Sequence, residues 1–227
     1  MATRAEPLFC FPVKLLARLL RLFFHLLYHP FAWTYDLIAW TVSFGRWKDW
    51  VRSVAPFLEG VRILELGHGP GHLQRFLLDL GLLPFGLDES PQMGRLAHAN
   101  LLKNGYTKAS LTRGLAQALP YANESFDTVV STFPTEYIFD PRTLHEIRRT
   151  LKNRGRIVIL PMAWITGKSP LDRFLSWLFK VTGQAPSEAI EVLEQRLSQP
   201  FQTAGFQVEI QRVEIKASTL LFLLARK

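Results

Sequence analysis

The sequence predicts an α/β protein, in which helices cover both faces of a doubly wound, mostly parallel sheet of about seven strands. Between residues 61 and 161, short apolar runs alternate with amphipathic helical stretches, as in successive βαβ units. Residues 205–227 contain two β-rich runs around a short Lys-Ala-Ser link, which predicts an antiparallel C-terminal β-hairpin in the same sheet. A helical arm, residues 1–34, precedes the domain, residues 35–227.

The composition is that of a globular protein with an excess of positive charge. Of the 227 residues, 48% are hydrophobic and 20% are charged, which is enough apolar material for one large domain with a full core. The single cysteine, Cys10, excludes an internal disulfide and fits a reducing compartment. The formal net charge of +8 favours a polyanionic partner, either nucleic acid or an anionic membrane surface.

The N-terminal arm is strongly apolar but has the features of neither a signal peptide nor a spanning helix. No small-residue cleavage site follows it, and its uncharged stretch after Arg21 meets Pro30 well short of the ~20 residues that a bilayer needs. Its polar residues lie three or four apart on one helical face: Lys14, Arg18, Arg21, His25 and Tyr28. This pattern is typical of a helix lying in the plane of a membrane. Packing of the apolar face on the protein's own core or on a partner subunit is the alternative.

Local signals place the elements of the domain in order. Residues 34–57 are rich in tryptophan and predict one or two helices. Strands are expected at 61–67, 84–88, 109–114, 126–133 and 155–161. Helices are expected at 72–81, 90–105, 140–155, 169–183 and 187–197. Ser90 and Asp140 each precede a proline, as N-caps do, and Gly81 and Gly105 stand where helices stop.

Three glycines follow the first predicted strand and predict a ligand-binding turn. Gly67, Gly69 and Gly71 allow main-chain N–H groups to approach an acceptor-rich or anionic group, at the carboxyl edge where such sheets bind ligands. Glu65, two residues before the turn, suits a ligand with an ammonium or hydroxyl group and would repel a pyrophosphate. A turn that needs glycine for packing alone is the alternative.

A second acid ends the second predicted strand. Asp88 lies about 20 residues beyond the glycine turn, where a carboxylate is placed to accept hydrogen bonds from ribose hydroxyls. The alternative is an acid that caps the next helix or lies in a surface turn.

Several motifs in order resemble class I S-adenosylmethionine-dependent methyltransferases. "ILELGHGPGHL" resembles the first motif of that superfamily, and "GLDESPQMGRLAHAN" resembles the second. "GLAQALPYANESFDTVVSTF" resembles the adenine-side loop with the fourth strand, and "LHEIRRTLKNRGRIVIL" resembles the helix and strand that follow. The resemblance covers about residues 35–227 and is strongest to small enzymes of ubiquinone and menaquinone synthesis and of phospholipid methylation. It implies a Rossmann-like fold and S-adenosyl-L-methionine as cofactor.

The resemblance also implies roles for individual residues. Gly67, Gly69 and Gly71 would line the methionine part of the cofactor, with Glu65 near its ammonium, and Asp88 would take both ribose hydroxyls. The remaining positions would flank the ribose, the adenine and the sulfonium: Ser90, Met93, Ala116, Gln117 and Thr132. The acceptor-side candidates for catalysis are Tyr35, which the resemblance places over the cofactor, and Glu136 and Tyr137, which follow the fourth predicted strand and could orient an amine or hydroxyl. For Glu136 and Tyr137, loop residues with local hydrogen bonds are the alternative.

The expected reaction is transfer of a methyl group to an apolar or lipid-like acceptor, such as a lipid amine or a quinone precursor. The apolar arm and residues 169–183 lie in parts that cover the acceptor in similar enzymes, and both are rich in Phe, Leu and Trp, which predicts the apolar acceptor. The basic stripe of the arm predicts that this cytoplasmic protein lies at the inner face of a membrane. We do not expect a nucleic-acid acceptor, since "STFPTEYI" lacks the N/D-P-P-Y/F signature of base methylation. A methyltransferase of soluble small molecules or RNA and a non-enzymatic binding module are the alternatives.

We expect no metal ion. His68 and His72 are four residues apart but lack the glutamate of an H-E-x-x-H motif, and His68 lies in the turn.

Overall fold

The computed structural model describes residues 43, 45–167 and 190–227. The arm, Tyr35 and the helix expected at 169–183 lie outside these residues, as does the expected boundary between arm and domain. Within the described part of the chain, no helix combines the length and the apolar character needed to cross a bilayer.

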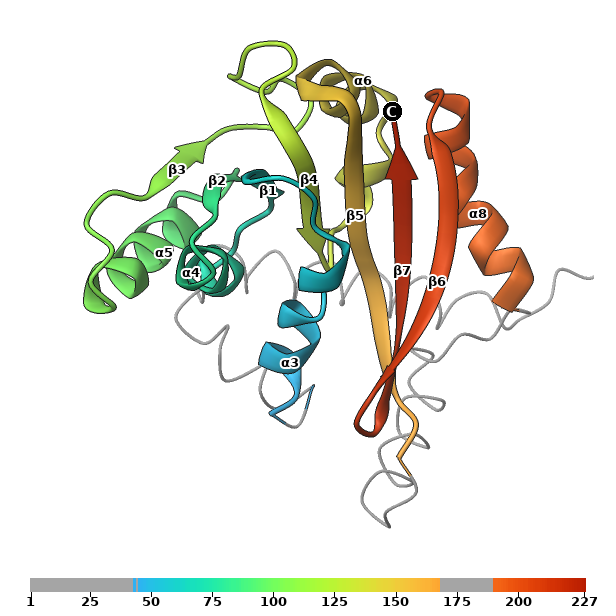
Figure 1. Ribbon diagram of the computed structural model, residues 1–227, viewed down its shortest axis with the longest axis horizontal. Helices are drawn as coiled ribbons and strands as arrows, with labels where there is room; N and C mark the ends of the chain where they lie inside the picture. Colours follow the sequence, from blue (N-terminus) through green and yellow to red (C-terminus); the bar gives the residue numbers. More distant parts are fainter. Residues whose placement is uncertain (1–42, 44, 168–189) are drawn as a thin grey trace, which may run out of the picture.

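Seven strands form one sheet in the order β3-β2-β1-β4-β5-β7-β6 (Figure 1). The strands are β1 (Arg62–Leu66), β2 (Leu83–Asp88), β3 (Ser110–Arg113), β4 (Phe126–Thr132), β5 (Leu151–Ile165), β6 (Gln207–Ile215) and β7 (Ser218–Arg226). The first five are parallel, whereas β7 runs antiparallel to β5 and β6. The predicted mixed sheet with its C-terminal hairpin is therefore confirmed.

Helices connect the strands and cover the sheet. They are α3 (Trp47–Arg52), α4 (His72–Asp79), α5 (Pro91–Lys103), α6 (Pro141–Thr150) and α8 (Ile190–Thr203), with short 3-10 helices η2 (Ala55–Phe57) and η3 (Glu136–Phe139). The predicted caps are confirmed. The Ser90 hydroxyl accepts the Met93 N–H, and the Asp140 carboxylate accepts the Arg142 N–H.

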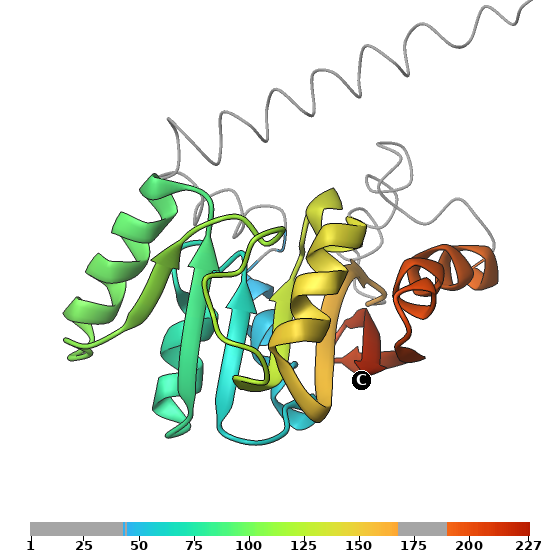
Figure 2. The same ribbon diagram turned by 90° about the horizontal axis from the view of Figure 1, so that it is seen from above.

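Apolar side chains alternate between the two faces of the sheet and so create two cores. On one face, α3 and α4 pack against strand residues such as Ile63, Val158 and Phe222. On the other face, the neighbours Leu64, Ile157 and Leu223 pack against α6 and α8. Because adjacent strand residues point to opposite faces, each central strand contributes to both cores. Figure 2 shows α3 and α6 on opposite sides of the sheet.

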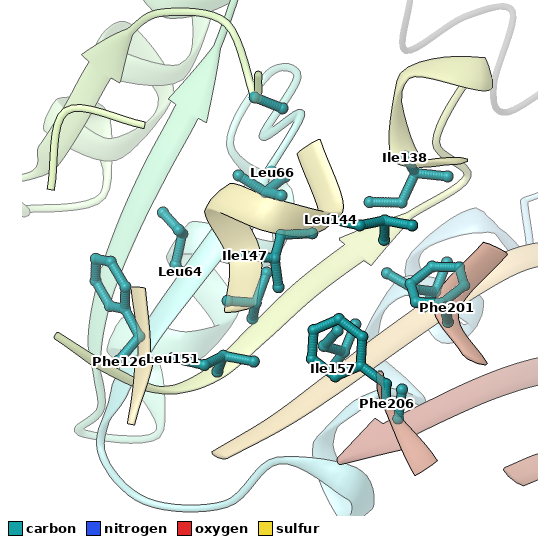
Figure 3. Packing of buried hydrophobic residues seen from close by; sticks show 14 of the residues in the cluster. Leu64, Leu66, Phe126, Ile138, Leu144, Ile147, Leu151, Ile157, Phe201 and Phe206 are labelled. Carbon is teal, nitrogen blue, oxygen red and sulfur yellow. The ribbon is translucent and has the colours of Figure 1, made fainter. Parts of the chain in front are cut away.

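The second of these cores holds the carboxyl ends of the strands in place. In Figure 3, Leu144 and Ile147 lie between Leu66 and Ile157, and Phe201 and Phe206 lie on one side of this cluster. All but Phe206 are at most 1% exposed. Close packing here fixes η3, which follows β4, relative to the end of β1.

β5 is longer than the sequence predicts. It begins at Leu151, in register with Phe126, and continues to Ile165, opposite Ser218. Pro161, where the predicted strand ended, has no N–H to donate to a neighbouring strand. The register with β7 shifts between Ile159 and Met162, and this irregularity lets the strand continue past the proline.

Candidate active site

The glycine turn lies at the carboxyl end of β1 and is fastened to β2 through its main chain. The Gly67 N–H donates to the Leu87 carbonyl at 2.8 Å. Gly67, Gly69 and Gly71 have φ angles of 71°, 51° and 83°, which other residues rarely adopt. The turn therefore requires glycine for its backbone conformation.

The three glycines differ in what surrounds them. A Cβ on Gly67 would lie 2.7 Å from the Tyr137 hydroxyl, and one on Gly71 would lie 3.0 Å from the Ala97 Cβ. A Cβ on Gly69 would meet no atom within 4 Å. Gly71 thus lets α5 approach the start of α4, whereas the space beside Gly69 is open to a ligand. The alternative, a turn that needs glycine for packing alone, explains Gly71 but does not explain Gly69.

Asp88 joins the glycine turn to the end of β2. Its Oδ2 accepts the Gly69 N–H at 2.9 Å, and its Oδ1 accepts the Ser90 N–H at 2.8 Å. A carboxylate can accept about four hydrogen bonds, so these two leave capacity on both oxygens. The side chain is half-buried, which keeps it accessible from the edge of the sheet.

Glu65 is a buried acid beneath the turn. Its side chain is 2% exposed, and its Oε2 accepts the Gln74 amide at 2.7 Å. Burial raises the pKa of Glu65 to about 8, the Gln74 hydrogen bond opposes this shift, and the Asp88 charge adds to it. In the free protein, Glu65 is therefore protonated at neutral pH.

His68 is a structural part of the turn. The ring is buried, and Nδ1 lies 2.7 Å from the Gly69 carbonyl oxygen, which can only accept, so Nδ1 carries the proton. Burial lowers the pKa of His68 although the Asp88 charge opposes this shift. Among the described residues, no group of three His, Cys, Asp or Glu side chains is arranged to hold a metal ion.

Tyr137 closes the turn from the side of β4. Its hydroxyl lies 3.0 Å from both the Leu66 carbonyl and the Ser131 Oγ, and the Ser131 hydroxyl donates to the same carbonyl at 2.7 Å. Of the predicted acceptor-side pair, Tyr137 thus lies against Leu66 and Gly67, whereas Glu136 is exposed.

The residues predicted to flank the ribose and adenine gather next to Asp88. The Gly114 N–H donates to the Asp88 carbonyl at 3.1 Å, which brings the following Ala116 and Gln117 to this edge. The Gln117 amide lies 3.4 Å from the Asp140 carboxylate. The side chains of Ser90, Met93 and Ala116 are buried. Their side chains therefore support the surface that a ligand would touch.

Thr132 ends β4, and an unusual residue follows it. Phe133 has a φ of 51°, which is rare for a bulky residue, and its ring stacks on Trp47 with centroids 4.4 Å apart. Such strained conformations are found preferentially at functional sites. The carboxyl end of β4 thus carries an aromatic pair beside Thr132.

Sequence reasoning missed two side chains that support the site, Gln74 and Ser131. Gln74 lies between Leu73 and Leu77 on the buried face of α4, so an amide on an apolar helix face was the available signal. Ser131 is buried at the end of β4. A polar residue at the end of a buried strand indicates a hydrogen bond but does not identify its partner.

The glycine turn offers main-chain donors next to two acids, at the carboxyl edge of a sheet with the strand order 3-2-1-4-5-7-6. This combination defines a Rossmann-like ligand-binding protein. Residues 63–155 match the family described as "Methyltransferase domain". The demethylmenaquinone methyltransferase of Thermotoga maritima is 34% identical over 142 residues, which are 60% of this chain and 60% of that protein. The enzyme of the same name from Symbiobacterium thermophilum is 30% identical over 165 residues, 68% of this chain and 63% of that protein.

Solved structures show the same fold. A putative S-adenosyl-L-methionine-dependent methyltransferase from Methanococcus maripaludis superposes with a TM-score of 0.60 at 15% identity, over 98% of this chain and 96% of that one. Phosphoethanolamine N-methyltransferase 2 from Haemonchus contortus, in complex with S-adenosyl-L-methionine, gives 0.56 at 17% identity, over 81% of this chain and 53% of that one. These similarities support a class I S-adenosylmethionine-dependent methyltransferase, and the chain spans about 60% of the length of the curated relatives it matches.

The packing role of Gly71 is testable with two glycines of the same region. Gly71→Ala should lower the free energy of unfolding by about 1–3 kcal/mol, because it adds a positive-φ penalty and a close contact with Ala97. Gly94→Ala, within helix α5 and with no atom within 4 Å of the added Cβ, should be neutral or stabilise by up to about 1 kcal/mol. Urea unfolding followed by circular dichroism measures both. Equal effects of the two substitutions would contradict the packing described.

Proposed function

We propose that the chain transfers a methyl group from S-adenosyl-L-methionine to an apolar acceptor, such as a quinone precursor. The observation that carries the proposal is the connection of the glycine turn to Asp88, with open space beside Gly69. The printed names of the relatives, demethylmenaquinone methyltransferases, support a quinone precursor as acceptor.

In this proposal each end of the cofactor has its own partner. Asp88 would accept the ribose hydroxyls on its remaining lone pairs, and Gly67 and Gly69 would line the methionine part. Glu65, once its proton is lost, would balance the ammonium. The wall on the adenine side would consist of Ser90, Met93, Ala116 and Gln117, and Thr132 would lie on the sulfonium side.

The cofactor supplies a methyl group that its sulfonium already activates for displacement. The protein's task is then to hold the acceptor atom in line with the methyl carbon and the sulfur, and to exclude water. The aromatic pair Trp47 and Phe133, beside Thr132, offers a flat apolar surface for a planar acceptor. Tyr137 fixes the end of β1 through the Leu66 carbonyl. We assign it this positioning role, while Tyr35 and Glu136 stay candidates for orienting the acceptor.

The proposal places the protein at the inner face of a membrane, in contact with anionic lipid through the arm. The support is the basic stripe of residues 14–28 and the apolar character of the acceptor. An acceptor with a long apolar chain is extracted from a bilayer more readily by an enzyme that lies on it.

Asp88 should be required for cofactor binding and methyl transfer. Asp88→Ala should weaken S-adenosyl-L-methionine binding by about 100-fold or more, because two charge-assisted hydrogen bonds are lost. Glu89→Ala, at the exposed neighbour, should bind as the parent does. Calorimetry measures the affinity, and transfer of a tritiated methyl group to a lipid extract containing demethylated quinone measures activity. Methylation of tRNA in place of the extract would refute the proposed acceptor.

The protonation of Glu65 should make cofactor binding pH-dependent. The free carboxyl has a pKa of about 8, and the ligand ammonium favours its ionised form, so the pKa is lower in the complex. Binding therefore releases a proton below pH 8, and affinity should rise with pH by up to about ten-fold per unit until pH 8. Calorimetry in buffers of different ionisation enthalpy detects the proton. Glu65→Gln should abolish the release, and an unchanged release in that variant would exclude Glu65 as its source.

The arm should bind anionic vesicles through its basic stripe. Arg18→Glu should weaken co-sedimentation with phosphatidylglycerol vesicles by about ten-fold or more, since each basic residue near such a surface contributes about 1 kcal/mol. Arg95→Glu, at an exposed position of α5, makes the same change of charge and should have little effect. If the parent chain fails to bind anionic and zwitterionic vesicles alike, the membrane part of the proposal is wrong.

A further inference from the structure

A basic pocket lies between α3, α4 and α5, next to Gly71 at the end of the glycine turn. Its cavity has a volume of about 320 Å³ and is bordered by four cationic side chains: Lys48, Arg52, Arg75 and Lys103. Figure 1 shows α4 and α5 side by side, with α3 next to them. Gly71 is the one residue of the glycine turn that borders it, whereas Gly67, Gly69 and Asp88, proposed above to hold the cofactor, do not.

Among the residues that the structure describes, few acids balance the positive charge of the basic pocket. Asp79, the one carboxylate among the described residues that line it, accepts the Tyr106 hydroxyl at 2.6 Å and lies 3.7 Å from Arg75. Asp79 therefore offsets Arg75. Within the described residues, no carboxylate forms an ion pair with Lys48, Arg52 or Lys103. Three positive charges thus converge on one cavity, where an anion would relieve their mutual repulsion.

The walls of the basic pocket are ordered by contacts within the protein. The Arg52 guanidinium lies over the Phe76 ring, 5.4 Å from its centroid. The Asn100 amide donates to the Pro70 carbonyl at 2.9 Å, and the Asn104 amide donates to the Asn100 carbonyl at 2.7 Å. These amides secure the main chain around the cavity. The cationic side chains do not take part in these main-chain contacts and are therefore available to bind a ligand.

The charge of the residues that line the cavity indicates the ligand. Lys48, Arg52, Arg75 and Lys103 carry positive charge, whereas Val51 and Phe76 add apolar surface. Lysine and arginine side chains around a tetrahedral anion are the common arrangement for phosphate. A nucleic-acid strand needs a row of phosphate contacts, whereas a single cavity suits one phosphate group.

We propose that the basic pocket binds the phosphate group of a phosphomonoester or phosphodiester, carried by the headgroup of an anionic phospholipid or by a soluble phosphorylated molecule. Lys48 and Lys103 bind the phosphate oxygens from α3 and α5, and Arg52 completes the site. This binding is independent of methyl transfer, because none of these residues belongs to the candidate active site.

Titrations of the full-length, ¹⁵N-labelled chain followed by NMR test the proposal. Inorganic phosphate and monomeric dihexanoyl phosphatidylglycerol should each shift the amides that surround the cavity. Lys48→Ala/Lys103→Ala should weaken binding of both by about ten-fold or more, since two charge-assisted contacts are lost. Arg95→Ala/Lys108→Ala removes the same charge at exposed positions outside the basic pocket and should change affinity less than about two-fold.

The outcomes separate the possible sources of the phosphate. Tighter binding of the lipid than of inorganic phosphate at the same amides assigns the pocket to a headgroup, and equal or weaker binding assigns it to a soluble phosphate. If neither shifts these amides, the proposal is overturned, and it is equally overturned if only tRNA does so. Both double variants should keep the parent's affinity for S-adenosyl-L-methionine, which separates failure here from unfolding and from failure of the proposed function.

Discussion

The carboxylate of Asp88 connects the two strand ends on which the candidate site is built. It accepts one main-chain N–H from the glycine turn after β1 and one from the turn after β2. Within the turn, the buried His68 ring bonds to the Gly69 carbonyl, and main-chain hydrogen bonds to Asp88 and Leu87 complete its shape. Because the Asp88 carboxylate keeps lone pairs free, the group that holds the turn is also placed to bind the ribose.

The buried side chains around this connection determine the charge beneath the turn and the position of its main chain. Glu65 is protonated in the free protein and forms a hydrogen bond with Gln74, so the floor of the turn carries no charge before a ligand arrives. On the β4 side, the hydroxyls of Ser131 and Tyr137 both contact the Leu66 carbonyl. The end of β1 is thus held from both sides, which lets main-chain donors be oriented before binding, at little entropic cost to the complex.

Local chemistry explains which parts of this arrangement can be predicted from the sequence. The caps at Ser90 and Asp140 and the positive-φ glycines depend on residues within a few positions of one another, so a single stretch of chain reveals them. The Gln74–Glu65 bond and the Tyr137 contact with Leu66 depend on packing between elements. No local pattern encodes that packing, so the sequence leaves open whether Tyr137 faces the acceptor or forms hydrogen bonds next to its loop.

The extent of β5 and the basic pocket also depend on packing between elements and not on local patterns. β5 extends past Pro161 because β7 pairs with it through an irregularity, which is a property of the partner strand. The charge of +8 predicts an anionic partner but not where it binds. Only the fold brings Lys103 of α5 to the same cavity as Lys48 and Arg52, which lie one turn apart on α3.

A crystal structure with S-adenosylhomocysteine bound tests the central claim most directly. Both ribose hydroxyls should lie within hydrogen-bond distance of the Asp88 carboxylate, with the amino acid part along Gly67 and Gly69 and the Asp88–Gly69 bond intact. A ribose bound elsewhere, or an Asp88 side chain rotated away from the glycine turn in the complex, would contradict the account.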